Sequence, residues 1–197
     1  FFNRAIVRAK LKNFKEAIKD YDVVISYDPK NLDALINQSA AYQDMGNFEE
    51  ALRVIVIALS IEPHNFKALV NRGNLYQNLF RYEDAIDDFD MAIKLEPSTL
   101  ETFVNRGNSL KFLGRLSEAA KSFDAALAID KNNANAQFHY SILLLSQKRF
   151  SEGWEKYKYR WKAKNLQQPK FVEDLPSFSI TERYGKILVW CEQGIGD

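Results

Sequence analysis

The sequence repeats itself with a fixed period of 34 residues, and this period constrains the fold more than any other feature. One proline series and one alanine series show the spacing: Pro29, Pro63 and Pro97, and Ala17, Ala51, Ala85 and Ala119. Repeats of this length bury their apolar faces by stacking on their neighbours. The period therefore predicts an elongated array of similar units rather than one central core.

Each unit contains two stretches with apolar residues at helical spacing, as the unit at 66–97 shows. Residues 66–79 form the first helix of the unit, helix A, and residues 82–95 form the second, helix B. We expect Gly73 to let the partner helix approach closely. Pro97 should end helix B, because proline has no amide hydrogen to continue the helical bonding.

Polar residues recur where each helix should begin. A residue able to accept a free backbone N–H precedes each of the later A helices: Asn31, Asn65, Thr99 and Asn133. Before helix B, Asn13 with Glu16 and Asn47 with Glu50 resemble capping boxes. These signals fix the expected helix starts.

Seven residues of the 66–97 unit match the places typical of the tetratricopeptide repeat: Leu69, Gly73, Tyr76, Ala85, Phe89, Ala92 and Pro97. The resemblance implies an all-α, right-handed superhelix of about five helix–turn–helix repeats. The repeats fall at 1–31, 32–65, 66–99, 100–133 and 134–164, giving A helices at 1–11, 32–45, 66–79, 100–113 and 134–147 and B helices at 14–27, 48–61, 82–95, 116–129 and 150–164. The residues expected to hold this packing are Gly73, Gly107, Ala51, Ala85, Ala119, Pro29, Pro63 and Pro97.

The overall charge and the cysteine count restrict the function classes. With 27 basic and 26 acidic side chains the chain is nearly neutral, which argues against a nucleic-acid or membrane-surface partner. The single cysteine, Cys191, excludes an internal disulfide and fits a reducing compartment, so we expect a cytoplasmic location. No apolar run reaches the roughly 18 residues of a membrane span. We expect no cofactor and no metal, and the missing initiator methionine indicates a fragment of a longer protein.

The last predicted helix, 150–164, carries aromatic residues among lysines and arginines. Trp154, Tyr157 and Trp161 are spaced as one helical face. Interleaved aromatic and basic residues can form a stacking platform for single-stranded nucleic acid. The alternative, which we favour, buries the aromatic face as in every earlier helix B and leaves the basic residues in water. On the third helix B, Asp87, Asp88 and Asp90 form a similar polar face, and we expect two of these three to point to solvent.

From residue 165 the period stops. Residues 165–185 contain two helix-breaking prolines and are expected to be a linker. The segment 186–197, KILVWCEQGIGD, has the pattern of a buried strand that runs into a glycine-rich turn, as at the start of a parallel α/β domain. It resembles the beginning of the heptosyltransferase-like (GT-B) domain that some bacterial proteins carry after such repeats. That resemblance makes Asp197 either a general base of the parent enzyme or a helix N-cap.

One row of polar residues runs along the array. The sixth place of helix A holds Asn3, Asn37, Asn71, Asn105 and then His139, with Ile36, Val70, Val104, Asn74 and Asn108 beside it. Places one period apart form a line along a superhelix, and this place faces its concave side. The carboxamides can bond the backbone of an extended peptide, as an asparagine ladder does in the similar O-linked N-acetylglucosamine transferase. Alternatively, they only bond neighbouring helices. His139 is expected to cap the row rather than to bind a metal.

The sequence therefore favours a protein-interaction scaffold that holds an extended polypeptide in a concave groove. The alternative is the substrate-recruiting part of a bacterial repeat–glycosyltransferase, in which case the catalytic domain starts near residue 186 and is missing here. The fragment itself should not be an enzyme. The repeat ends and the tail 186–197 offer routes to self-association, because an unpaired apolar strand can pair with another chain.

Overall fold

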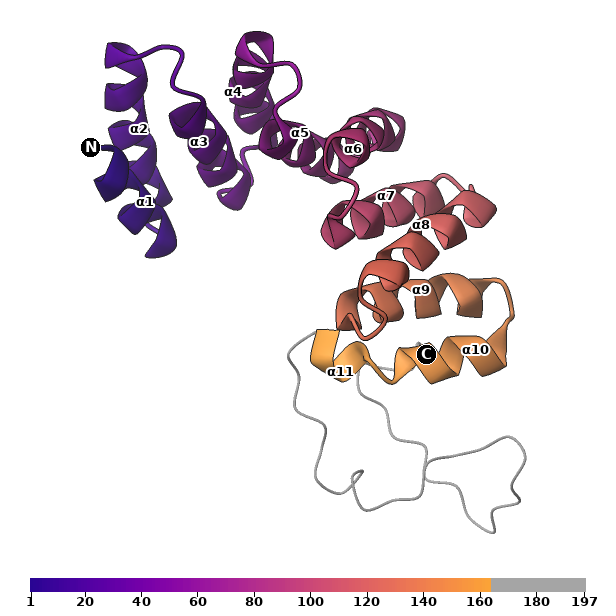
Figure 1. The fold of residues 1–197 in the computed structure, drawn as a ribbon. Coiled ribbons are helices and arrows are strands. Elements are labelled where there is room, and N and C mark those ends of the chain that lie inside the picture. The colour runs from indigo at the N-terminus through magenta and orange to yellow at the C-terminus, as the bar shows by residue number, and fades with distance from the viewer. Residues whose placement is uncertain (164–197) are drawn as a thin grey trace, which may run out of the picture.

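A computed structural model describes residues 1–163, and within this range the chain has eleven helices and no strand (Figure 1). The helices are α1 (Phe2–Lys10), α2 (Phe14–Tyr27), α3 (Leu32–Asp44), α4 (Phe48–Ile61), α5 (Phe66–Asn78), α6 (Tyr82–Leu95), α7 (Leu100–Phe112), α8 (Leu116–Ile129), α9 (Ala134–Ser146), α10 (Phe150–Tyr157) and α11 (Arg160–Ala163). The linker and strand predicted for 165–185 and 186–191 lie outside the described residues, as does Asp197.

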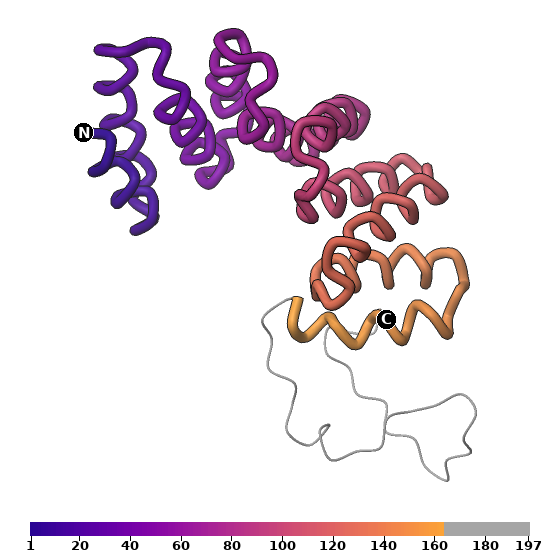
Figure 2. Tube along the Cα trace, in the orientation of Figure 1, coloured from indigo at the N-terminus to yellow at the C-terminus, as the bar shows by residue number. Residues whose placement is uncertain are grey.

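The helices stack in chain order as a curved array. From α1 to α10 each helix packs on the next one along the chain, α11 packs back on α9, and the A helices α1, α3, α5, α7 and α9 also contact one another in sequence. The trace bends so that α3, α5, α7 and α9 lie on the inner side of the curve (Figures 1 and 2). The all-helical solenoid is the predicted fold class. Its inner surface is built from A helices.

The contact between the helices of a repeat depends on very small residues. Ala51, Ala85 and Ala119 of the B helices are fully buried. A Cβ atom at Gly73 would lie 2.6 Å from Cε1 of Phe89, and one at Gly107 would lie 2.9 Å from Cε1 of Phe123. Each of these glycines therefore makes room for a phenylalanine ring of its own repeat, which is fully buried in both cases.

Three of the four expected asparagine or threonine caps make the capping bond. Asn31, Asn65 and Asn133 accept a backbone N–H at 3.0–3.1 Å, whereas Thr99 makes no such side-chain bond. The predicted capping boxes at Asn13 and Asn47 are wrong, because neither side chain caps its helix. The tight turn before helix B gives Asn13 and Asn47 ψ values of 58° and 68°, well short of the 94–115° of the three working caps.

The last repeat differs from its prediction. The single helix expected at 150–164 is two helices, because α10 ends at Tyr157 and α11 begins at Arg160. The three aromatic residues do not share one buried face. Trp161 is buried at 9% exposure, and Trp154 is 54% exposed. The prediction of a fully buried aromatic face is therefore wrong at Trp154.

The turns from helix A to helix B all contain one residue in the left-handed conformation. Gly46 and Gly114 occupy it with φ of 78° and 73°, and in the third repeat the residue is Phe80, with φ of 58° and 78% exposure. A Cβ atom is strained in this conformation. We expect Phe80→Gly to raise the free energy of unfolding by about 1 kcal/mol. Urea unfolding would measure the change. Phe80→Ala removes the ring but keeps the strain, so an equal gain from the alanine variant would contradict this explanation.

Candidate functional site

The polar row predicted on the A helices is divided between α1, α3, α5, α7 and α9. Asn3 on α1 is exposed, whereas Asn37 on α3, Asn71 on α5, Asn105 on α7 and His139 on α9 are all half-buried. The A helices that carry these residues contact one another in sequence and follow each other along the inner side of the curve (Figure 1). Asn3 differs from the others in its exposure.

Polar side chains tie α5 to α7. Asn105 donates from Nδ2 to Oδ1 of Asn74 at 2.9 Å. Gln77 donates from Nε2 to the carbonyl oxygen of Asn105 and to Oγ of Ser109, both at 2.8 Å. Asn105 is thus part of a contact between neighbouring helices, which is the alternative role considered for the row. Sequence reasoning missed Gln77 and Ser109; the signal available was that Gln77 lies 28 residues before Asn105, close to one period.

Asn37 and Asn71 differ from Asn105 in having unused carboxamides. Within residues 1–163, neither side chain makes a hydrogen bond to another part of the protein. Each carboxamide offers two N–H donors and one acceptor oxygen. Ile36 is buried on α3 next to Asn37, and Val70 is half-buried on α5 next to Asn71. These two positions therefore combine free polar groups with apolar surface.

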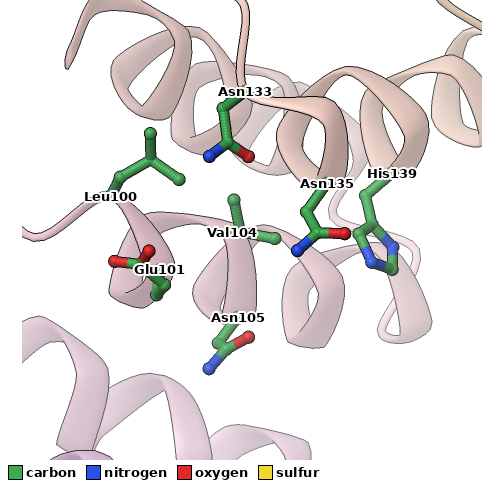
Figure 3. Close-up of a pocket in the computed structure, with 7 residues that line it drawn as sticks. All are labelled: Leu100, Glu101, Val104, Asn105, Asn133, Asn135 and His139. Carbon is green, nitrogen blue, oxygen red and sulfur yellow. The ribbon is translucent and has the colours of Figure 1, made fainter. Parts of the chain in front are cut away.

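A pocket of about 180 Å³ lies between the first turns of α7 and α9 (Figure 3). Seven residues line it: Leu100, Glu101, Val104, Asn105, Asn133, Asn135 and His139. Of the predicted groove residues, Val104 and Asn105 line this pocket, and Ile36 lines a second one between α3 and α5. Glu101 and Asn135 were not predicted. Each lies one residue after the first residue of its helix, a position at which no pattern in the sequence indicates a binding role.

Two groups on α7 and α9, Lys111 and His139, have lowered pKa values. Burial lowers the pKa of His139 to about 4, and the charge of Lys111 adds to this shift. Burial also lowers the pKa of Lys111. At neutral pH His139 is therefore an uncharged donor and acceptor. Among the described residues, no three His, Cys, Asp or Glu side chains gather as metal ligands do. The chemistry available here is hydrogen bonding, apolar contact, the half-buried positive charge of Lys111 and the negative charge of Glu101.

The lowered pKa of His139 predicts a pH dependence of stability. In the unfolded chain histidine titrates near 6.5, so the unfolded state binds more protons between about pH 6.5 and 4. The stabilisation is complete above pH 6.5 and is lost as the pH falls towards 4, by at most about 3 kcal/mol. His139→Asn, which introduces the residue of the preceding repeats, should reduce this loss. His64→Asn, in an exposed turn, should leave it unchanged. Urea unfolding at pH 7 and pH 4.5 measures both, and equal pH responses of wild type and His139→Asn would contradict the assignment.

Comparison with known proteins finds matches to a repeat family over part of the chain. Two family models, each described as tetratricopeptide repeat, match residues 66–99 and 104–159. None of the curated proteins matches the chain by sequence. Among solved structures, a crystal structure of MamA is 17% identical with a TM-score of 0.73, covering 84% of this chain and 96% of that one.

A second similar structure, MamA from residue 41 to its end from Desulfovibrio magneticus RS-1, is 13% identical with a TM-score of 0.75 and covers 83% of this chain and 92% of that one. At such identities the likeness shows the shared fold. Over the described range, no helix is both long and apolar enough to cross a membrane.

Proposed function

Because the chain carries tetratricopeptide repeats and folds as an all-helical solenoid, we propose that it is a protein-interaction scaffold that binds an extended polypeptide along its inner surface. The observation that carries the proposal is the pair of free carboxamides on adjacent A helices, Asn37 and Asn71. Polar groups that are half-buried and make no internal bond are available to a ligand.

The row recognises the backbone of the ligand. Each carboxamide donates to a peptide carbonyl and accepts from a peptide N–H, which are the groups that an extended chain presents regularly. Val70 supplies half-exposed apolar surface between the polar positions, and Ile36 and Val104, although buried, line the pockets where side chains of the ligand can pack. Such a site tolerates many sequences, because most of its hydrogen bonds go to groups that every residue has. Its specificity then depends on the few charged positions of the inner surface.

The double variant Asn37→Ala/Asn71→Ala tests the proposal. Peptides are first selected with the wild-type chain from a random-peptide library displayed on phage, and the affinity of a synthetic copy is then measured by fluorescence polarisation. Each lost neutral hydrogen bond is worth about 0.5–1.5 kcal/mol, so the double variant should bind about tenfold more weakly. Its helicity should not change, because neither carboxamide bonds the protein.

Two further variants serve as controls. Asn47→Ala removes an exposed carboxamide of the turn between α3 and α4 and should bind like wild type. Asn105→Ala removes a bond to Asn74 and should lower stability as well as affinity. If the double variant binds the selected peptide as tightly as Asn47→Ala does, the row has no role in binding.

The alternative function concerns the tail, which lies outside the described residues. The similarity of 186–197 to the start of a heptosyltransferase-like domain motivates the proposal that the repeats deliver an acceptor to a catalytic domain in a longer parent protein. The 197-residue chain should then hydrolyse or transfer no sugar from a sugar nucleotide. In the parent, Asp197→Asn should abolish transfer if Asp197 is the base and preserve it if Asp197 is only a helix cap.

A further inference from the structure

The junction between α7 and α9 occupies the same place in the array as the junction between α5 and α7, one repeat later. Three pairs of residues correspond across one period: Asn74 with Asn108, Gln77 with Lys111, and Asn105 with His139. In the first junction these side chains bond each other and the facing backbone. The two junctions therefore differ by the replacement of two amide side chains with a lysine and a histidine.

Two polar groups of the second junction make no hydrogen bond within residues 1–163. Oδ1 of Asn108 is buried and accepts no hydrogen bond. Lys111 is half-buried and makes no hydrogen bond or ion pair within residues 1–163; its Nζ lies 5.4 Å from the ring centre of Phe112. The serine that receives Gln77 in the first junction, Ser109, corresponds to Leu143, which offers no side-chain acceptor. The junction therefore holds a buried acceptor and a partly desolvated cation, which are both costly when unpaired.

Within residues 1–163, Lys111 forms no ion pair with an acidic side chain; on α6, which packs on α7, Asp88 is held by Arg72 and Asp90 by Arg106. On α7 itself Glu101 lies ten residues earlier, about 15 Å along the helix axis. On α8 Glu118 is held by Arg115, with two contacts of 2.8 and 2.6 Å. On α9 the facing titratable group is His139, and on α10 Lys156 donates to Gln137. Lys111 therefore carries a half-buried charge that no carboxylate within residues 1–163 pairs with, and the acidic residue that lines the pocket beside His139 is Glu101.

We propose that Lys111, Asn108 and His139 form a subsite of the inner surface that takes the carboxylate side chain of an aspartate or glutamate in the bound polypeptide. The subsite rests on the proposed function, since it sits beside the polar row. Lys111 has three N–H donors, enough to serve both the carboxylate and Oδ1 of Asn108. Neutral His139 supplies a further N–H donor. A hydrogen bond between charged partners is about twice as strong as one between neutral groups, so this one contact sets the sequence preference of an otherwise tolerant groove.

Lys111→Gln is the variant that tests the subsite, because it restores the residue that the preceding repeat carries at the same place. Gln77 packs and hydrogen-bonds there, so the variant should fold. Lys121→Gln, on the exposed surface of α8, is the charge-matched control. Lys111→Glu reverses the charge. Each protein is used to select peptides from the same phage-displayed random-peptide library, and synthetic copies of the selected peptides are measured by fluorescence polarisation.

The wild type and Lys121→Gln should select peptides enriched in aspartate or glutamate at one position. Lys111→Gln should still select peptides but lose that enrichment, and it should bind the wild-type peptide about tenfold more weakly. Replacing the enriched acid by its amide should then weaken binding to wild type and not to Lys111→Gln. Lys111→Glu should enrich lysine or arginine instead. The subsite would be overturned if the peptides selected by the wild type show no acidic preference. It would also be overturned if Lys111→Gln selects peptides with the same acidic preference. Either result would leave the scaffold function standing. Selection of no peptide by any of the proteins would instead overturn the scaffold function on which the subsite rests.

Discussion

Phe89→Ala is expected to lower the free energy of unfolding by about 3–5 kcal/mol, the largest effect among the variants proposed for this protein. The Phe89 ring is fully buried and lies against Gly73, where even one added methyl group would come within 2.6 Å of it. Removing the ring leaves a cavity between α5 and α6 that neighbouring residues cannot fill without moving helices. Urea unfolding followed by circular dichroism measures the loss.

Two controls make this prediction specific. Phe112→Ala removes a ring of the same size that is 64% exposed, and it should cost less than about 1 kcal/mol. Gly73→Ala should destabilise by about 1–3 kcal/mol through overpacking, and less so when Phe89 is also replaced by leucine. A Phe89→Ala loss no larger than that of Phe112→Ala would show that the ring does not hold the repeat together.

Asp88→Ala is expected to cost about 2–4 kcal/mol, the second largest effect. Asp88 and Arg72 form two hydrogen bonds of 2.8 and 2.6 Å between α6 and α5, and their side chains are only 6% and 25% exposed. Removing the carboxylate leaves a guanidinium that is mostly out of water without its partner. Arg72 keeps some solvent contact, which places the loss toward the lower end of what a buried ion pair shows. Urea unfolding at neutral pH measures it.

The matched control is Asp84→Ala, whose ion pair with Arg81 is about half exposed on both sides and should be worth less than about 1 kcal/mol. The double variant Arg72→Met/Asp88→Leu should recover most of the stability, because apolar residues of similar size carry no desolvation cost. The pKa of Asp88 reflects the same desolvation cost: burial raises it, although the hydrogen bond and the charge of Arg72 act to lower it. If the double variant is as unstable as Asp88→Ala, the cost does not come from the unpaired arginine.

The repeat period made the helices predictable and left their polar contacts largely unpredicted. The first four B helices begin and end at the expected residues, because each has an apolar face set by the fixed period, and a proline follows the first three of them. The A helices end one residue early, before a left-handed turn residue that the periodicity does not register. The break between α10 and α11 was missed because the aromatic spacing there is equally compatible with one straight helix.

The polar contacts between helices follow a rule that becomes readable only once the stacking is known. Arg4 pairs with Asp20 and Arg72 with Asp88, sixteen residues later in the same repeat. Gln38 and Arg106 instead reach back sixteen residues, to Asp22 and Asp90 of the preceding repeat. Both choices have the same spacing, so sequence alone does not select between them. For this reason the buried role of Asp88 was not foreseen within a face that was expected to be mostly solvated.

In the candidate site, too, the positions of residues on the helices could be predicted from the sequence, whereas their contacts could not. The row of asparagines could be placed on successive A helices because its members lie one period apart. The bond between Asn105 and Asn74 could not be foreseen, since it depends on how closely α5 and α7 approach. Nor could the isolation of Lys111 be read from the residue itself. It follows from Leu143 standing where the preceding repeat has a serine acceptor.

The central claim is that the inner surface formed by the A helices binds an extended polypeptide. The most direct measurement is a two-dimensional amide NMR titration of the isotope-labelled chain with a peptide selected from the random library. Our account predicts shifts along α3, α5, α7 and α9, including the side-chain amides of Asn37 and Asn71, while the outer surfaces of α4, α6 and α8 stay unchanged. Shifts concentrated on the B helices, with the Asn37 and Asn71 carboxamides unaffected, would contradict it.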